Sequence, residues 1–183
     1  MTVLFQAPHR VMFLAGSVQI LVVIGWWAAE LAARAGWLPM WPWPLYPGWL
    51  HGVWLIYGLY PFFFFGFLMT AMPRWQNAAA VSARVYLTVF CLCGVGWLAF
   101  AAGLLFPKVL PAALAAVLLG WAVALIDLLR VANTPHPDRV VPRIVVAAFS
   151  AGVLGLVLLL ARTLGADESA LRAALDIGSW WFL

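Results

Sequence analysis

The chain has 183 residues, of which 67% are hydrophobic and only 9% are charged. About a quarter of the residues in a soluble globular domain are charged, so this composition excludes an ordinary soluble fold and is typical of a multi-span membrane protein. Ten lysines and arginines against six acidic residues give a net charge of +4. Because these cations stand in short clusters between apolar runs, they indicate membrane topology rather than nucleic-acid binding.

Five apolar runs are long enough to cross a bilayer, since a spanning helix needs about 20 residues. The first run is longer than the apolar part of a signal peptide, and we expect it to remain as a span. The runs are Val11 to Ala33, Trp49 to Met72, Val85 to Phe106, Val109 to Leu129 and Val141 to Ala161. The predicted fold class is therefore an all-α polytopic transmembrane bundle, with residues 1–183 as a single transmembrane domain.

A sixth apolar segment begins near Leu171 and reaches Leu183. A helix of about a dozen residues cannot cross the bilayer, which favours the interpretation that the chain is the N-terminal part of a longer protein. The alternative is a helix that lies in the membrane interface, for which Trp180 and Trp181 are suitable residues.

Tryptophan alternates with proline in the loop before the second span, residues 41–47. Each proline disfavours helical geometry at the preceding residue, and tryptophan and tyrosine favour the headgroup region. We therefore expect this loop to cap the membrane surface near His51. Within the span, Pro61 is a candidate helix break, and the helix is expected to stop at Pro73 and Arg74.

The cations are divided unequally between the two ends of the predicted bundle. Six stand at the N-terminal end (Arg10, Arg74, Arg84, Arg130, Arg139 and Arg143), and four stand at the other end (Arg34, Lys108, Arg162 and Arg172). Cations are in excess on cytoplasmic loops. The N-terminus is therefore predicted to be cytoplasmic, with His51 at the outer face.

His51 is the first candidate ligand, because a neutral imidazole binds haem iron, copper or zinc. A regular α-helix would place four residues on the same face as His51, namely Leu55, Gly58, Phe62 and Met69. This face, with a glycine notch and a flat aromatic ring, would accept either a planar cofactor or another helix. The alternative for His51 is a hydrogen-bonded residue at the membrane interface.

His9 is the second candidate cofactor ligand and is expected at the same end as Arg74. Met69 and Met72 also lie near this end, and their thioethers can bind copper(I), although methionines at helical spacing more often fill packed interfaces. Met69 is about 27 Å along the helix from His51, so the two cannot share a metal.

The few polar residues within the spans have ready structural explanations. Glu30 precedes Arg34 by four residues, and Asp127 precedes Arg130 by three, which predicts ion pairs at helix ends. Gln19 is expected to hydrogen-bond to another helix.

Catalytic signatures are missing from the sequence. There is no glycine-rich phosphate loop and no HExxH, GxSxG or CxxC motif. Cys91 and Cys93 lie in one span, where the CxC spacing points the thiols about 200° apart, so we expect free packing residues. We assign no catalytic residue.

Two segments, APHRVMFLAG at residues 7–16 and LHGVWLIYGLYPFFFFGFLMTAMPRWQ at residues 50–76, resemble the NnrS family. Members are bacterial inner-membrane proteins of roughly twelve spans that are linked to the nitric oxide response and nitrosative-stress resistance, and they bind haem and copper. The resemblance implies haem and copper as cofactors, His51 as a haem or metal ligand, His9 as a cofactor ligand and nitric oxide as a small-molecule ligand. It also implies the lipid bilayer, and respiratory or denitrification membrane proteins, as partners.

The chain departs from this family at one point. Many members have a pattern like HxHE that begins at the first histidine, and here Val53 and Trp54 occupy the second histidine and the acidic position. A partner ligand for His51 must then come from elsewhere in the protein. Two other function classes remain open: a metal-free transporter or permease segment, for which matching broken helices would be expected, and a structural or assembly partner of a respiratory complex.

Overall fold

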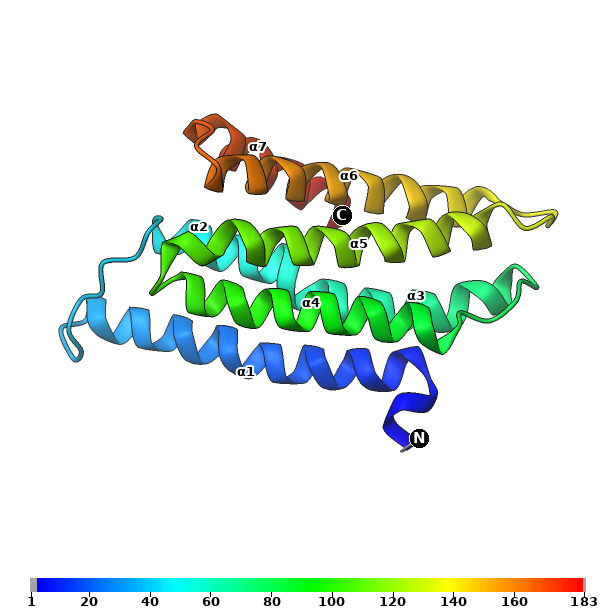
Figure 1. Cartoon of the computed structure of the whole chain (residues 1–183), viewed down its shortest axis with the longest axis horizontal. Coiled ribbons are helices and arrows are strands. Elements are labelled where there is room, and N and C mark those ends of the chain that lie inside the picture. The colour runs from blue at the N-terminus through cyan, green and yellow to red at the C-terminus, as the bar shows by residue number, and fades with distance from the viewer. Residues whose placement is uncertain (1–2, 183) are drawn as a thin grey trace.

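The structure is a computed structural model that describes residues 3–182, with 180–182 as backbone only. Five helical runs in this part of the chain are long and apolar enough to cross a membrane (Figure 1). They are α1 (Pro8–Arg34), the continuous run of α2 (Pro47–Val53), η2 (Trp54–Leu59) and α3 (Tyr60–Trp75), then α4 (Ala83–Gly103), α5 (Leu110–Ala132) and α6 (Val140–Thr163). No strand occurs in the described residues, and the predicted all-α transmembrane bundle is confirmed.

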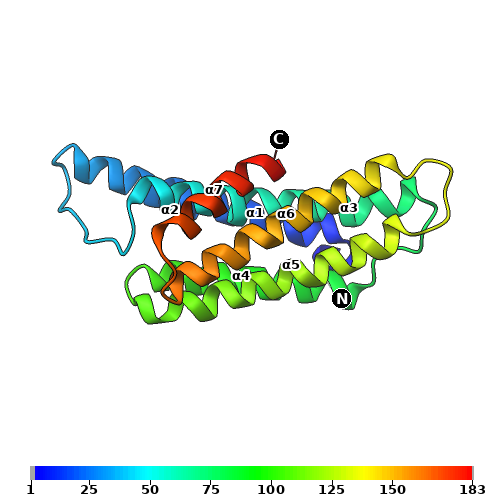
Figure 2. The ribbon, with the colours of Figure 1, turned by 90° about the horizontal axis from the view of Figure 1, so that it is seen from above.

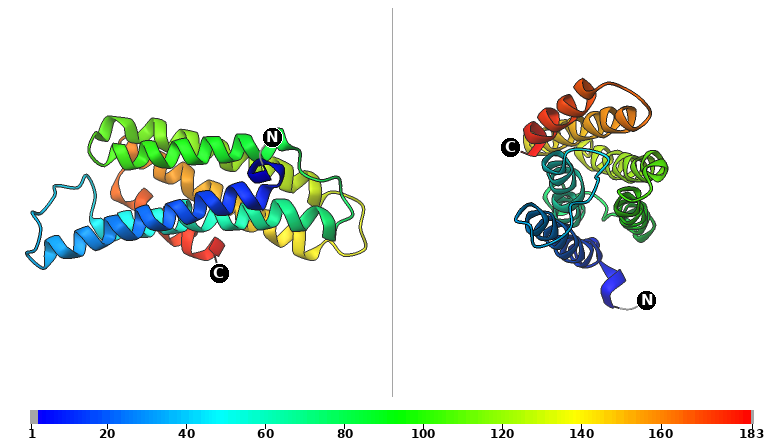
Figure 3. Two further views of the ribbon diagram at one scale, coloured as in Figure 1. Left: turned by 90° about the horizontal axis from the view of Figure 1, so that it is seen from below. Right: turned by 90° about the vertical axis from the view of Figure 1, so that its left-hand side faces the viewer.

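The spans run up and down, and their connections gather at the two ends of the bundle (Figure 1). The His9 end contains the start of α1 and the connections from α3 to α4 and from α5 to α6; the His51 end contains the loop from α1 to α2. Seen end-on, α4 and α5 form one pair, α6 and α7 another, and the second span lies between them and α1 (Figure 3). Of the five spans, the second has the largest share of its most apolar residues buried inside the bundle, 56%. The second span is therefore the centre of the packing.

The second span contains a π-helix, η2, directly before Pro61. The N–H of Tyr60 donates to the carbonyl of Leu55, five residues back, where an α-helix would use the fourth. Proline has no N–H and its ring crowds the carbonyl four residues earlier, so the wider turn accommodates Pro61 without ending the helix. The extra residue turns the side chains that follow by about 100°. The helix break expected at Pro61 is therefore a local widening.

The expected stop at Pro73 and Arg74 is also slightly wrong, because α3 continues through Pro73 to Trp75. The helix ends in a Schellman motif: the N–H of Ala78 donates to the carbonyl of Pro73, and Asn77 donates to that of Arg74. This motif requires a left-handed residue, and Asn77, with φ of 49°, supplies it. Asparagine tolerates this conformation better than most residues. The residue that ends the helix is therefore Asn77, and not Pro73.

The predicted sixth segment forms α7 (Glu168–Phe182), which turns back along α6 and reaches the second span (Figure 2). Leu171 and Ala174 are fully buried, and the Tyr57 hydroxyl of η2 donates to the carbonyl of Ala174. Helix α7 is thus packed into the bundle. The side chains of Trp180 and Trp181, which suggested an interfacial helix, lie outside the described residues.

Candidate functional site

At the first candidate site, His51 lies in α2 and stacks on Trp27 of α1. The ring centroids are 4.3 Å apart and the planes differ by 17°. The Nδ1 atom of His51 is buried and has no hydrogen-bond partner in the described structure. The stack orients the plane of the imidazole, and no hydrogen bond to Nδ1 contributes to this orientation in the described residues.

The loop of tryptophan and proline is fastened to α1 beside His51. The carboxylate of buried Glu30 accepts from Arg34 Nε at 2.9 Å and from the indole N–H of Trp43 at 2.7 Å. The predicted ion pair of Glu30 with Arg34 is confirmed, and the Trp43 bond is a contact that sequence spacing could not reveal. Since both oxygens have partners, Glu30 acts as an anchor for the loop.

Replacing Trp43 with phenylalanine tests this anchor. The variant keeps an aromatic ring against Trp26, 5.5 Å away, but leaves one buried oxygen of Glu30 without a donor, which costs about 1–3 kcal/mol. We expect faster amide hydrogen exchange in residues 35–46, measured by mass spectrometry in detergent. Trp41→Phe, at a half-exposed residue whose indole N–H makes no hydrogen bond in the described residues, is the matched control; equal exchange in both variants would contradict the anchor.

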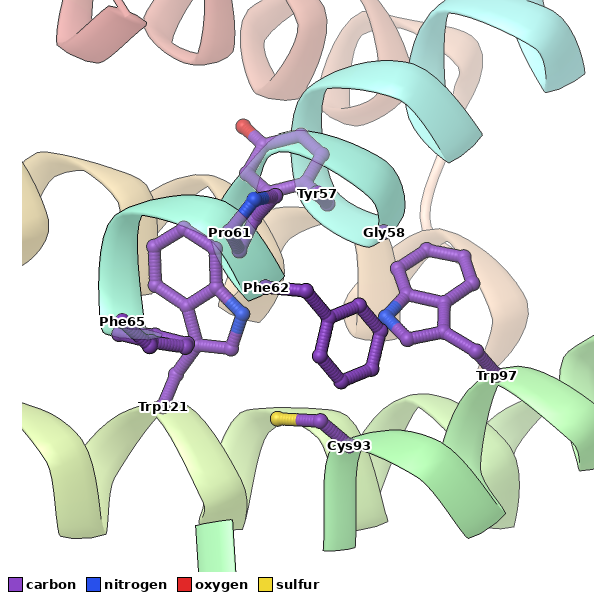
Figure 4. A pocket seen from close by; sticks show the side chains of 8 residues that line it. All are labelled: Tyr57, Gly58, Pro61, Phe62, Phe65, Cys93, Trp97 and Trp121. Carbon is purple, nitrogen blue, oxygen red and sulfur yellow. The ribbon is translucent and has the colours of Figure 1, made fainter. Parts of the chain in front are cut away.

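The single face predicted for His51 is wrong. Gly58 and Phe62 turn towards α4 and α5, where they meet Trp97, Trp121 and other residues (Figure 4). His51 instead stacks on Trp27 of α1. The cause is the π-helix, which contains Gly58 and breaks the regular phase between His51 and the residues from η2 onwards. The side chains around Gly58 leave no space for even a water molecule. Other helices therefore occupy the face of Gly58 and Phe62, and the packing there leaves no room for a planar cofactor.

The two positions that depart from the family pattern are part of the core. Val53 and Trp54 are both 1% exposed, and Trp54 packs against Trp26, Trp97 and Phe100. These two side chains therefore do not supply a second ligand for a metal at His51.

The second candidate site surrounds His9 at the opposite end of the bundle. The hydroxyl of Thr70 donates to the carbonyl of Gly66 at 2.8 Å, and His9 Nδ1 is 3.3 Å from the same hydroxyl oxygen. With the Thr70 proton donated to Gly66, the second bond requires the His9 tautomer that has its proton on Nδ1, and in this neutral tautomer the lone pair is on Nε2. Histidines that bind metals are held in this way by a partner of their other nitrogen.

His9 lines a pocket of about 390 Å³, which we call the His9 pocket. Three helices form it: the start of α1, the end of α3 and the start of α4. Its lining residues are Gln6, Ala7, Pro8, His9, Met69, Thr70, Pro73, Arg74, Ala78, Ala80, Val81, Ala83 and Tyr86. The two segments that carry the family resemblance, 7–16 and 50–76, thus meet here. The sequence predicted that His9 lies at the same end as Arg74. It could not predict the hydrogen bonds of Thr70 to His9 and of Tyr86 to Phe5, because each joins residues more than 60 positions apart.

The two candidate histidines cannot bind the same metal. His51 contacts Trp27, which lies 18 residues beyond His9 on α1, or about 27 Å along the helix. Among the described residues, no group of three His, Cys, Asp or Glu side chains could hold a metal ion.

Three other polar predictions can be compared with the structure. The ion pair of Asp127 with Arg130 is confirmed at 2.8 Å, and Cys93 is a free, buried packing residue. The hydrogen bond expected for Gln19 is wrong: its buried Nε2 has no partner within residues 3–182.

These features define a multi-pass helical membrane protein with one candidate histidine near each end of the bundle. The family model for the NnrS protein matches residues 3–183. The chain therefore belongs to the NnrS family, whose membrane proteins are linked to the nitric oxide response. Comparison with curated proteins and with solved structures gave no match.

Proposed function

We propose that this chain binds haem and takes part in the response to nitric oxide in the bacterial inner membrane, where nitrosative stress or denitrification supplies that gas. Membership of the NnrS family supports the general role. The observation that carries the cofactor proposal is the setting of the two histidines: His51 Nδ1 has no hydrogen-bond partner in the described residues, and His9 is held through its Nδ1 by Thr70. When bound, haem iron supplies a coordination position for nitric oxide.

His51 and His9 are the ligands we propose, one at each end of the bundle. His51 is the ligand suggested by the family motif, and its orientation is fixed by Trp27. His9 has a lone pair on Nε2 because Thr70 accepts its Nδ1 proton, and a pocket lies beside it. Copper is proposed at His51 only with further ligands from outside the described residues.

The excess of arginine at the His9 end supports a cytoplasmic N-terminus. His51 and the loop of residues 35–46 would then face the periplasm, and respiratory or denitrification proteins of the same membrane would be its neighbours. We propose that residues 1–183 act as one transmembrane domain, with binding or sensing of nitric oxide rather than turnover as its role.

The test is the absorption spectrum of the purified protein after expression with haem and copper supplied, with metal content measured in parallel. We expect a Soret band that shifts when nitric oxide is added. His51→Ala and His9→Ala should each change this band if that histidine binds iron, and His136→Ala, at an exposed loop residue, is the control. The absence of both a Soret band and bound copper would overturn the proposal, whereas a band unchanged in both variants would overturn only the ligand assignment.

A further inference from the structure

Arg74 is a cation at the edge of the His9 pocket. Two other cations at this end have side-chain partners: Arg10 donates to the carbonyl of Val3, and Arg130 pairs with Asp127. No hydrogen bond, ion pair or ring contact of the Arg74 guanidinium is found within residues 3–179. Arg84 also lacks such a partner there but does not line the pocket, so its place in the lining distinguishes Arg74.

The rest of the described pocket lining has the chemistry of an anion site. No aspartate or glutamate contributes to it, so nothing in the lining neutralises Arg74. Helix α1 begins in the pocket with Pro8, and Ala7 before it gives no side-chain cap. The first N–H groups of this 27-residue helix therefore keep the partial positive charge of a helix N-terminus on the same side as Arg74.

Much of the remaining lining is apolar. Met69, Pro73 and Val81 line the pocket and are buried, and on the same helix end Phe67 and Trp75 are exposed and form an edge-to-face pair 5.6 Å apart. A ligand that fits must combine a negative group with an apolar body. Tyr86 is not free to bind it, because its hydroxyl donates to the carbonyl of Phe5.

We infer that the His9 pocket binds the oxyanion of an amphiphilic ligand, a phosphate or a carboxylate, and that Arg74 is the residue that holds this group. A guanidinium matches both oxyanions with two parallel N–H bonds, which a lysine cannot reproduce. The group has two sources at this depth, the phosphate of an anionic phospholipid and a carboxylate of haem. Only the second source rests on the proposed function.

The experiment compares Arg74→Gln with Arg84→Gln in the full chain. Arg84 is an exposed cation at the same end that does not line the pocket, so it controls for a general loss of charge. Two quantities are measured: the affinity for short-chain phosphatidylglycerol in detergent, and the rate at which haem transfers from the protein to apomyoglobin. Far-UV circular dichroism checks that both variants are folded.

We expect Arg74→Gln to change one of these quantities by about tenfold while Arg84→Gln changes neither. Weaker binding of phosphatidylglycerol assigns the phosphate, and faster loss of haem assigns the carboxylate. Arg74→Lys should recover only part of the loss, because it keeps the charge without the paired donors. The inference is overturned if Arg74→Gln changes neither quantity, or if Arg84→Gln has the same effect. A protein that holds no haem would contradict the proposed function and still leave the lipid measurement as a test of the pocket.

Discussion

Trp54→Ala is expected to lower the free energy of unfolding by about 3–5 kcal/mol, the cost typical of removing a buried tryptophan. The indole is 1% exposed and lies between Trp26 of α1, 5.7 Å away, and Trp97 of α4, 6.5 Å away. In a membrane the hydrophobic effect contributes little between helices, because lipid is as apolar as the core. The loss is therefore one of packing contacts, which the cavity left by the indole cannot restore.

The measurement is unfolding by sodium dodecyl sulfate in mixed micelles, followed by circular dichroism. Leu98→Ala is the control: Leu98 lies one residue from Trp97 on α4 but is 67% exposed, on a face that we expect to contact lipid. This control should change the stability by no more than about 0.5 kcal/mol. Equal losses in the two variants would show that Trp54 is not at the centre of the packing.

The five spans could be predicted from the sequence because crossing a membrane is a local property of each segment. Length and hydropathy decide it, and no contact between helices is needed. The same holds for the ion pair of Glu30 with Arg34, whose spacing within one helix brings the side chains together. The second bond of Glu30, from Trp43, depends on the path of an irregular loop and has no spacing rule.

The face of His51 could not be predicted, because one wide turn changes every residue after it. A period of 100° per residue holds through α2 but not through η2, so Gly58 within η2 and Phe62 after it meet α4 and α5 instead. Proline at position 61 was a visible signal for an irregularity, but proline alone does not distinguish a kink from a π-helix. The His9 pocket was predictable only as a common end for His9 and Arg74. The bond of His9 with Thr70 required the packing of α1 on α3.

Gly155→Ala is the sharpest test of how α6 and α7 are attached to the second span. A methyl group at this position of α6 would overlap the hydroxyl of Tyr57, and Tyr57 cannot withdraw without breaking its bond to the carbonyl of Ala174. We expect a loss of about 1–3 kcal/mol, the usual cost of overpacking a rigid site. Gly94→Ala on α4 is the matched control, since no atom lies within 4 Å of the added methyl. This control should be neutral or slightly stabilising, because alanine favours helix over glycine.

A double-mutant cycle then separates the clash from any general intolerance of α6 to substitution. Tyr57→Phe removes the hydroxyl that the new methyl would meet, although the ring carbon beneath it stays 2.9 Å from the methyl position. Gly155→Ala should therefore cost about 1 kcal/mol less in the Tyr57→Phe background than in the native chain. Additive effects of the two substitutions would mean that Gly155 does not provide the slot for Tyr57. A coupled result would identify this tyrosine as the residue that holds the α6–α7 pair against the π-helix of the central span.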